Sequence, residues 1–254
     1  VQDAERALEQ FSGTPFGETV QLPGDARLTF RHAGHILGAA TVDIEWGGRR
    51  IVFSGDLGRY DDPLLFDPQP VSEANYVVIE STYGNRLHGP DDPAEALGAL
   101  VEKTVARGGT IVIPAFAVGR AQLLLYYLWK LREVGRLTSV PVYLDSPMAI
   151  NASGLLCAHL EDHRMPADRC QEICGVATYT REVAESKKIT DSRFPKIVIS
   201  ASGMASGGRV LHHLKAFAPD GANTILLAGF QAAGTRGQAM LQGASQIKIH
   251  GQWV

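Results

Sequence analysis

The sequence has few cysteines, no long apolar run and little net charge, and each absence narrows the class of protein. The three cysteines, Cys157, Cys170 and Cys174, are too few and too unevenly placed among 254 residues for a disulfide framework, which favours a reducing cytoplasm. The longest apolar stretch, residues 123–131, is interrupted by Lys130, whereas a membrane-spanning helix needs about 18 apolar residues. We therefore predict a cytoplasmic protein without a membrane segment.

The formal net charge is −3, with 20% charged and 45% hydrophobic residues. This combination excludes disorder as the main state. It also predicts no bulk attraction to nucleic acid, so any such binding must come from a local patch. The length is enough for one large domain or two of ordinary size, and no signal peptide is visible.

The first 90 residues have the pattern of a β-rich domain. Gly47-Gly48 predicts a tight hairpin, and a loop rich in Asp and Pro covers residues 61–70. Four runs of strand-forming residues are expected to form strands, at 27–31, 40–46, 49–54 and 75–80.

Beyond residue 90, helices and strands alternate. A helix is predicted to begin at Asp92-Pro93, where Asp caps and Pro fits the first turn, and to end before Gly108-Gly109. The later predicted elements are strands at 110–114, 140–144, 196–200, 223–228 and 246–250, and helices at 119–134 and 206–217, with helical and loop segments over 150–190. The alternation predicts an α/β fold with a parallel sheet flanked by helices. We divide the chain into a β-rich part at 1–90, an α/β module at 91–236 and a return to the first part at 237–254.

Three predicted strands in the first part are followed by polar groups beside glycine. His35 lies in Arg31-His-Ala-Gly-His-Ile-Leu-Gly, Asp56 in Phe53-Ser-Gly-Asp-Leu-Gly, and Glu80 opens Glu-Ser-Thr-Tyr-Gly84. A rigid scaffold can aim such side chains at one point. Three independent turns explain the same pattern, since no short metal motif such as His-x-x-x-His occurs here. On spacing alone, both interpretations stay open.

A second group of polar residues lies between a predicted strand and helix in the α/β module. Ser202-Gly203 and Gly207-Gly208-Arg209 could present backbone N–H groups and a guanidinium to a phosphate, or could form a tight turn that needs glycine for packing. Residues 180–215 hold seven Lys or Arg against three Asp or Glu, which favours phosphate binding. Arg120, at the start of another helix, is a further phosphate candidate, with a structural ion pair as the alternative.

Other residues with metal-binding chemistry are interpreted as structural. His159 and His163 are spaced i, i+4, but the glutamate between them stands at the third position and not at the second, as a zinc protease motif requires, so we predict an exposed helix face. The three cysteines do not make a four-ligand set and are interpreted as packing or surface residues. His250 is interpreted as a structural strand residue.

Seven motifs, in order, resemble the β-CASP branch of the metallo-β-lactamase fold. They are the three segments that carry His35, Asp56 and Glu80, followed by Pro114-Ala-Phe-Ala-Val-Gly-Arg-Ala-Gln122, Leu144-Asp-Ser-Pro-Met-Ala149, Ser200-Ala-Ser-Gly-Met204 with Gly207-Gly-Arg209, and Gly229-Phe-Gln-Ala-Ala-Gly-Thr235. The resemblance covers about residues 25 to 252. It implies a partial αββα metallo-β-lactamase sandwich with an inserted β-CASP module.

The resemblance also implies roles for these residues. His35 corresponds to a zinc-ligating histidine, Asp56 to the carboxylate that bridges two zinc ions, and Glu80 to the acidic residue that supports the site. In such a family two zinc ions activate a hydroxide that attacks an RNA phosphodiester. The implied activity is zinc-dependent endoribonuclease, with 5′ exoribonuclease as a further mode, in a cleft beside the inserted module. Ser202, Gly203, Arg209 and Arg120 would bind RNA.

The sequence departs from the family pattern at both ends. The signature His-x-His-x-Asp-His, which supplies most zinc ligands, is absent from the 254 residues, as are the later Ser-Ala-His and His-Gly-Glu motifs. We therefore expect an internal segment of a longer enzyme that is inactive alone. The alternative is a catalytically inactive RNA-binding scaffold of the same family. RNA is the expected partner, and a homodimer is left open.

Overall fold

The computed structural model describes residues 2–87 and 89–254, and the chain divides into two compact units, residues 1–87 and 88–254. Each unit has its own sheet, and each is described by itself. Within the described residues, no helix combines the length and the apolar character that a membrane crossing requires.

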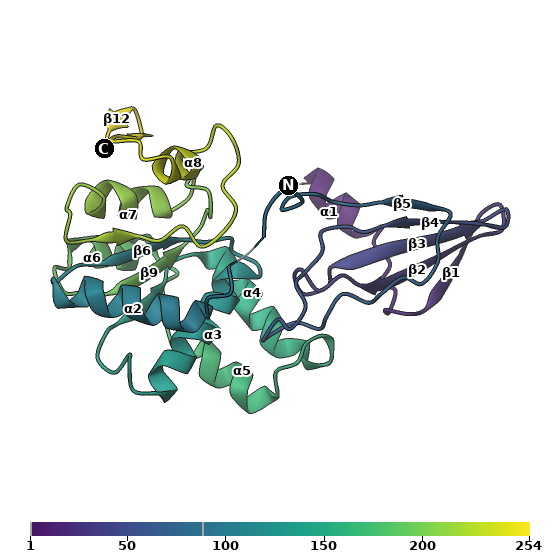
Figure 1. The fold of residues 1–254 in the computed structure, drawn as a ribbon, viewed down its shortest axis with the longest axis horizontal. Helices are drawn as coiled ribbons and strands as arrows, with labels where there is room; N and C mark the ends of the chain where they lie inside the picture. The colour runs from purple at the N-terminus through teal and green to yellow at the C-terminus, as the bar shows by residue number, and fades with distance from the viewer. Residues whose placement is uncertain (1, 88) are drawn as a thin grey trace. The chain divides into compact units, whose positions relative to one another are not determined.

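The first unit is built on a five-stranded sheet with the order β1-β2-β3-β4-β5 (Figure 1). Its strands are Thr19–Leu22 (β1), Ala26–His32 (β2), Ala40–Trp46 (β3), Arg49–Phe53 (β4) and Tyr76–Val78 (β5), and a helix, Gln2–Leu8 (α1), precedes them. Neighbouring strands are antiparallel up to β4, whereas β5 pairs with β4 in parallel. Gly47 and Gly48 both adopt a positive φ and form the predicted hairpin between β3 and β4.

The second unit contains a parallel five-stranded sheet with the order β10-β6-β9-β7-β8. Its strands are Ile111–Pro114 (β6), Val142–Leu144 (β7), Thr178–Tyr179 (β8), Ile197–Ser200 (β9) and Thr224–Ile225 (β10), and a small hairpin of Lys248–Ile249 (β11) and Gln252–Trp253 (β12) follows. The strands β6 and β9 are buried along their whole length, as expected of parallel strands covered on both faces.

Helices cover both faces of this sheet. They are Pro93–Ala106 (α2), Arg120–Glu133 (α3), Pro147–Ala158 (α4), Ala167–Cys174 (α5), Val183–Asp191 (α6), Val210–Phe217 (α7) and Arg236–Leu241 (α8), with a 3₁₀ turn at Leu160–Asp162 (η1). In Figure 1, α2 and α3 lie on one side of β6 and β9, and α7 on the other. The predicted α/β class, a parallel sheet flanked by helices, is confirmed.

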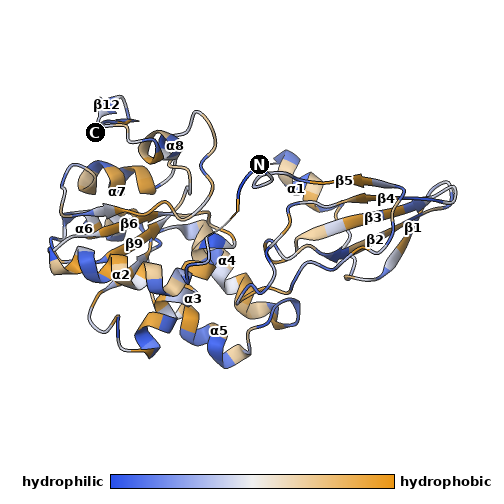
Figure 2. Ribbon diagram, viewed as in Figure 1, coloured by the Kyte–Doolittle hydropathy of each residue, from blue (hydrophilic) through white to orange (hydrophobic). Residues whose placement is uncertain are grey.

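The core of the second unit continues from the sheet through α7 into the last residues. Val112 of β6 packs in one buried cluster with Val210 and Leu214 of α7 and with Ile247 and Ile249. Figure 2 shows the matching apolar colour along the central strands and on α7. The prediction that residues 237–254 return to the first part stays a prediction.

Several predicted elements have other bounds in the structure, and three of the differences concern the candidate residues or their neighbours. The helix predicted from residue 206 begins at Val210, because Ala205 and Gly208 adopt positive φ values of 52° and 82°, which an α-helix cannot contain. The strand predicted at 223–228 is limited to Thr224–Ile225. His250, predicted to lie in a strand, occupies the turn between β11 and β12 with a φ of 46°.

Candidate functional site

Glu80 connects the loop after β4 to the loop after β5. Its backbone N–H donates to Ser54 Oγ at 3.0 Å, and its carboxylate accepts hydrogen bonds from the backbone N–H of Leu57 at 3.2 Å and of Thr82 at 2.9 Å. These bonds, that of Thr82 foremost, hold the pKa of Glu80 below its usual value, and the nearby His35 adds to the effect. Glu80 is therefore a charged group that is held in place and bonded to Leu57, the residue that follows Asp56.

The loop that carries His35 packs against the loop that carries Asp56. Gly58 donates its backbone N–H to the carbonyl of Ala33 at 2.7 Å. A Cβ atom added at Gly58 would overlap the carbonyl of Gly34 and lie 2.8 Å from the backbone nitrogen of His35. Glycine at position 58 is therefore required for this close approach. Together with Glu80, the contact brings the loops of all three sequence-predicted residues to one place.

His35 and Asp56 supply only part of the ligand set that a zinc ion needs. His35 and Asp56 are exposed and Glu80 is half-buried. An imidazole and a carboxylate are normal zinc ligands, but zinc in proteins takes about four. Two groups of three His, Cys, Asp or Glu side chains have ligand atoms within 4.8 Å of one another in the described part of the chain, and neither includes His35, Asp56 or Glu80. Their assignment as a metal site stays a prediction, with His35 and Asp56 fitting two positions of a larger ligand set.

In the second unit, a buried aspartate organises the region predicted to bind phosphate. Asp145, at the end of β7, is fully buried and accepts hydrogen bonds from His213 Nε2 and Arg209 Nη1, both at 2.7 Å, and from Ser186 Oγ at 2.5 Å. Burial opposes its ionisation, but the bonds from His213, Ser186 and Arg209 outweigh burial and lower the pKa of Asp145. The carboxylate is thus charged, and both of its oxygens accept hydrogen bonds.

Arg209 is held by the protein itself. Besides its bond to Asp145, Nη1 donates to the carbonyl of Thr180 at 3.1 Å, and Nη2 donates to the carbonyl of Arg181 at 2.5 Å. Its side chain is 21% exposed. Arg209 therefore joins β7, the segment after β8 and the start of α7, and most of its donor capacity is used internally. Phosphate binding by Arg209 stays a prediction.

Ser202 and Gly203 shape the loop between β9 and α7. The hydroxyl of Ser202 accepts hydrogen bonds from the backbone N–H groups of Ser206 at 3.0 Å and of Gly207 at 3.2 Å. The N–H of Gly207 is one of those predicted to face an anion. Gly203 is buried, and a Cβ atom there would lie 2.8 Å from the backbone nitrogen of Phe116. The structure therefore supplies the packing explanation for these residues, and their RNA-binding role stays a prediction.

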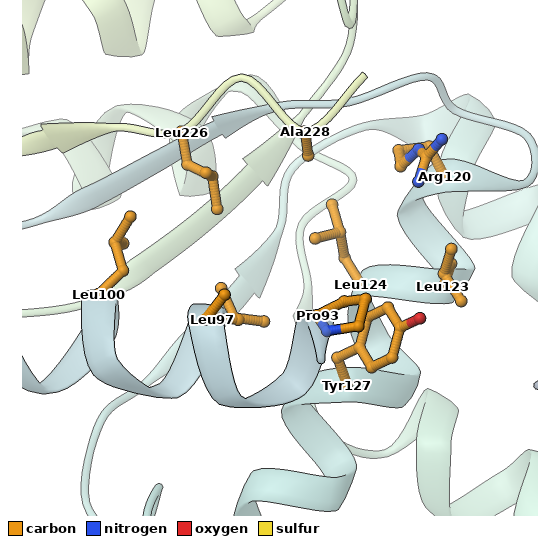
Figure 3. A pocket seen from close by; sticks show the side chains of 10 residues that line it. Pro93, Leu97, Leu100, Arg120, Leu123, Leu124, Tyr127, Leu226 and Ala228 are labelled. Carbon is orange, nitrogen blue, oxygen red and sulfur yellow. The ribbon is translucent and has the colours of Figure 1, made fainter. Parts of the chain in front are cut away.

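Arg120 lies at the first turn of α3, beside an apolar pocket of about 280 Å³ (Figure 3). The pocket is lined by Leu97 and Leu100 of α2, by Leu124 and Tyr127 of α3, and by segments beyond β10. No carboxylate pairs with Arg120 in the part of the chain that the structure describes. Its guanidinium is therefore not neutralised by an ion pair, which leaves the phosphate role of Arg120 as a prediction.

Some residues lie differently from the sequence expectation. His163 is 3% exposed rather than on an exposed face, and it accepts the N–H of Met165 at Nδ1 while Nε2 donates to the carbonyl of Leu156. Cys157 and Cys170 form a disulfide, so their interpretation as packing or surface residues was wrong. Sequence reasoning also missed the Asp145 network, although Asp145 ends a predicted strand, a position where functional side chains gather in parallel sheets.

Part of the second unit is similar to a known domain family. Residues 121–240 match the family model of the Beta-Casp domain. That match covers most of the second unit, including α3 to α8. The β-CASP domain that the motifs predicted is thus confirmed over these residues.

Several curated proteins are similar along nearly the whole chain. Ribonuclease TTHA0252 of Thermus thermophilus is 34% identical over 261 residues, covering 100% of this chain and 60% of that protein. Transcription termination factor FttA of Methanosarcina mazei is 34% identical, covering 93% and 39%, and the RNase J-like protein of Methanocaldococcus jannaschii is 31% identical, covering 97% and 59%. The chain thus spans about 60% or less of the length of these relatives.

Proposed function

We propose that the protein carrying this chain is a zinc-dependent ribonuclease that hydrolyses RNA phosphodiester bonds in the cytoplasm. The observation that supports this most is the bond from the Leu57 N–H to the Glu80 carboxylate, next to Asp56, while Gly58 bonds to the loop of His35. Independent turns would not need this convergence. Two similar proteins are named as a ribonuclease and as an RNase J-like protein, which supports the reaction class.

The three residues would divide the work as follows. His35 and Asp56 would hold the metal, which when bound would polarise the phosphodiester and acidify a water molecule. Glu80, charged and tied to two backbone N–H groups, would hold the loop of Asp56 in place and favour the imidazole orientation of His35 that binds metal. The cleavage we propose is internal, with removal of 5′ nucleotides as a further mode.

RNA binding in this proposal rests on exposed cations of the second unit. Arg181, Lys187, Lys188 and Arg193 are exposed, whereas Lys196 is 1% exposed and donates to the carbonyls of Ser192 and Phe194. With Arg120, the exposed cations would bind phosphates without reading bases. This predicts RNA affinity that falls steeply with salt and depends little on sequence.

Cleavage of labelled RNA by the full-length protein tests the proposal. The wild type is expected to cleave with metal and to stop with a chelator, and Asp56→Asn is expected to lower cleavage by about 100-fold or more. Asp25→Asn is the matched control, since Asp25 is exposed in the turn between β1 and β2 at a positive φ that Asn also adopts. Undiminished cleavage by the Asp56 variant would contradict the metal role. RNA binding without cleavage in the presence of metal would support the inactive scaffold instead.

A further inference from the structure

The three cysteines of the chain converge at the contact between helices α4 and α5. Cys157 at the end of α4 forms a disulfide with Cys170 of α5, with the two Cα atoms 5.7 Å apart. Cys174, one turn further along α5, places its sulfur 3.4 Å from the sulfur of Cys157. All three sulfur atoms lie within 4.8 Å of one another. Cys157 is therefore within reach of two different partners.

The environments of the three cysteines differ. Cys170 is 1% exposed, whereas Cys157 and Cys174 are partly exposed. Cys174 is the free thiol, and burial raises the pKa of that thiol. A thiol that stays protonated at neutral pH resists direct oxidation, so Cys174 can persist beside the disulfide.

We propose that these residues form a thiol–disulfide exchange site in which Cys157 bonds alternately to Cys170 and to Cys174. In the step, the Cys174 thiol loses its proton and its sulfur attacks Cys157 Sγ. The Cys157–Cys170 bond breaks as the Cys157–Cys174 bond forms, and Cys170 leaves as a thiolate that takes up the proton. The exchange needs no external oxidant or reductant, because one disulfide replaces another.

The helical spacing presents both α5 cysteines to Cys157. Cys170 and Cys174 are separated by four residues, so both point from the same face of α5 toward α4. The Cys174 sulfur also faces back to the carbonyl of Ser153 on α4, at 3.9 Å. Exchange therefore moves the link between the two helices by one turn of α5 while keeping Cys157 as its fixed end.

Peptide mapping of the intact chain in glutathione redox buffers tests this site. After acid quenching and alkylation, digestion with trypsin and a glutamate-specific protease separates Cys170 from Cys174, because Glu172 lies between them. The wild type is expected to yield both the Cys157–Cys170 and the Cys157–Cys174 cross-links. Cys174→Ser is expected to yield only the first, Cys170→Ala only the second, and Cys157→Ser neither.

The outcomes separate the proposal from a fixed structural disulfide. Finding only the Cys157–Cys170 link in the wild type at every glutathione ratio would overturn it. So would failure of Cys170→Ala to form the Cys157–Cys174 link in a buffer where Cys174→Ser is fully cross-linked. Alanine is chosen at position 170 because a buried cysteine packs like a small apolar residue. Circular dichroism checks the fold of each variant, and the wild-type result decides the question even if a variant unfolds.

Discussion

At the scale of single residues, Glu80 is the side chain that ties the first unit's loops together. Glu80→Gln removes the charge from the acceptor of the Leu57 and Thr82 N–H groups. Because hydrogen bonds to charged groups contribute about 1.5–3 kcal/mol, we expect exchange at these two amides to accelerate about tenfold or more. Hydrogen exchange measured residue by residue checks this. Glu18→Gln, at an exposed position, is the control, and equal protection in both variants would show that Glu80 does not anchor the loops.

Arg209 distinguishes a structural role from a phosphate-binding role. Arg209→Lys keeps the positive charge but loses the fork that joins Asp145 to the carbonyls of Thr180 and Arg181. We expect the free energy of unfolding to fall by about 2 kcal/mol, measured by urea denaturation. Arg193→Lys, on the exposed surface, should have no measurable effect. A variant of unchanged stability and weakened RNA binding would instead assign Arg209 to phosphate.

The buried carboxylate of Asp145 predicts a pH dependence. Since its pKa is lowered in the folded state, the unfolded chain binds the proton more readily, and the stabilisation is present above the unfolded pKa near 4. It is lost as the pH falls from there through the lower folded pKa. We expect the urea midpoint of the second unit to decrease between pH 5 and pH 3. A midpoint that is constant over this range would show that Asp145 is not charged and paired as described.

At the scale of elements, the contact between the loops after β2 and β4 depends on a missing side chain. Gly58→Ala would place a Cβ atom against the backbone of Gly34 and His35 and force the two loops apart. We expect a destabilisation of about 1–3 kcal/mol, as for other overpacked sites, read from thermal unfolding of the first unit. Gly13→Ala is the control, because no atom lies within 4 Å of a Cβ there. Equal melting temperatures for the two variants would contradict the close approach.

The elements that the sequence predicted well are those with local signals. Asp92 caps α2 by accepting the N–H of Ala94, and Pro93 occupies the first turn, so the start of this helix is encoded within three residues. The loop from 201 to 209 was not predictable in this way. Its path depends on Ser202 closing onto Gly207 and on Arg209 reaching Asp145, 64 residues away. A pattern read along the chain has no access to that partner.

In the candidate site, too, local sequence signals were predictable and contacts between distant residues were not. Strand ends beside glycine indicated His35, Asp56 and Glu80, and the structure brings their loops together through Gly58 and Leu57. The engagement of Arg209 by internal partners was not visible, since a buried carboxylate and an RNA phosphate attract the same guanidinium. The cysteine cluster was missed for a related reason, because Cys157 and Cys170 are joined only once α4 and α5 pack.

At the scale of the whole molecule, the candidate metal ligands and the cations proposed to bind RNA lie in different units. The chain is slightly acidic, with a formal charge of −3, but the cations of residues 180–215 are concentrated in the second unit. The candidate metal ligands lie in the first unit, His35 on the loop after β2 and Asp56 on the loop after β4. Under the proposed function, metal binding and RNA binding would thus belong to different units of the chain.

The metal content of the full-length protein after extensive dialysis tests the central claim most directly. Wild-type protein is expected to retain zinc, and a variant with His35→Ala and Asp56→Asn is expected to lose most of it while keeping its circular dichroism spectrum. Zinc retained at the wild-type level by the folded double variant would show that His35 and Asp56 are not ligands, and would contradict the account.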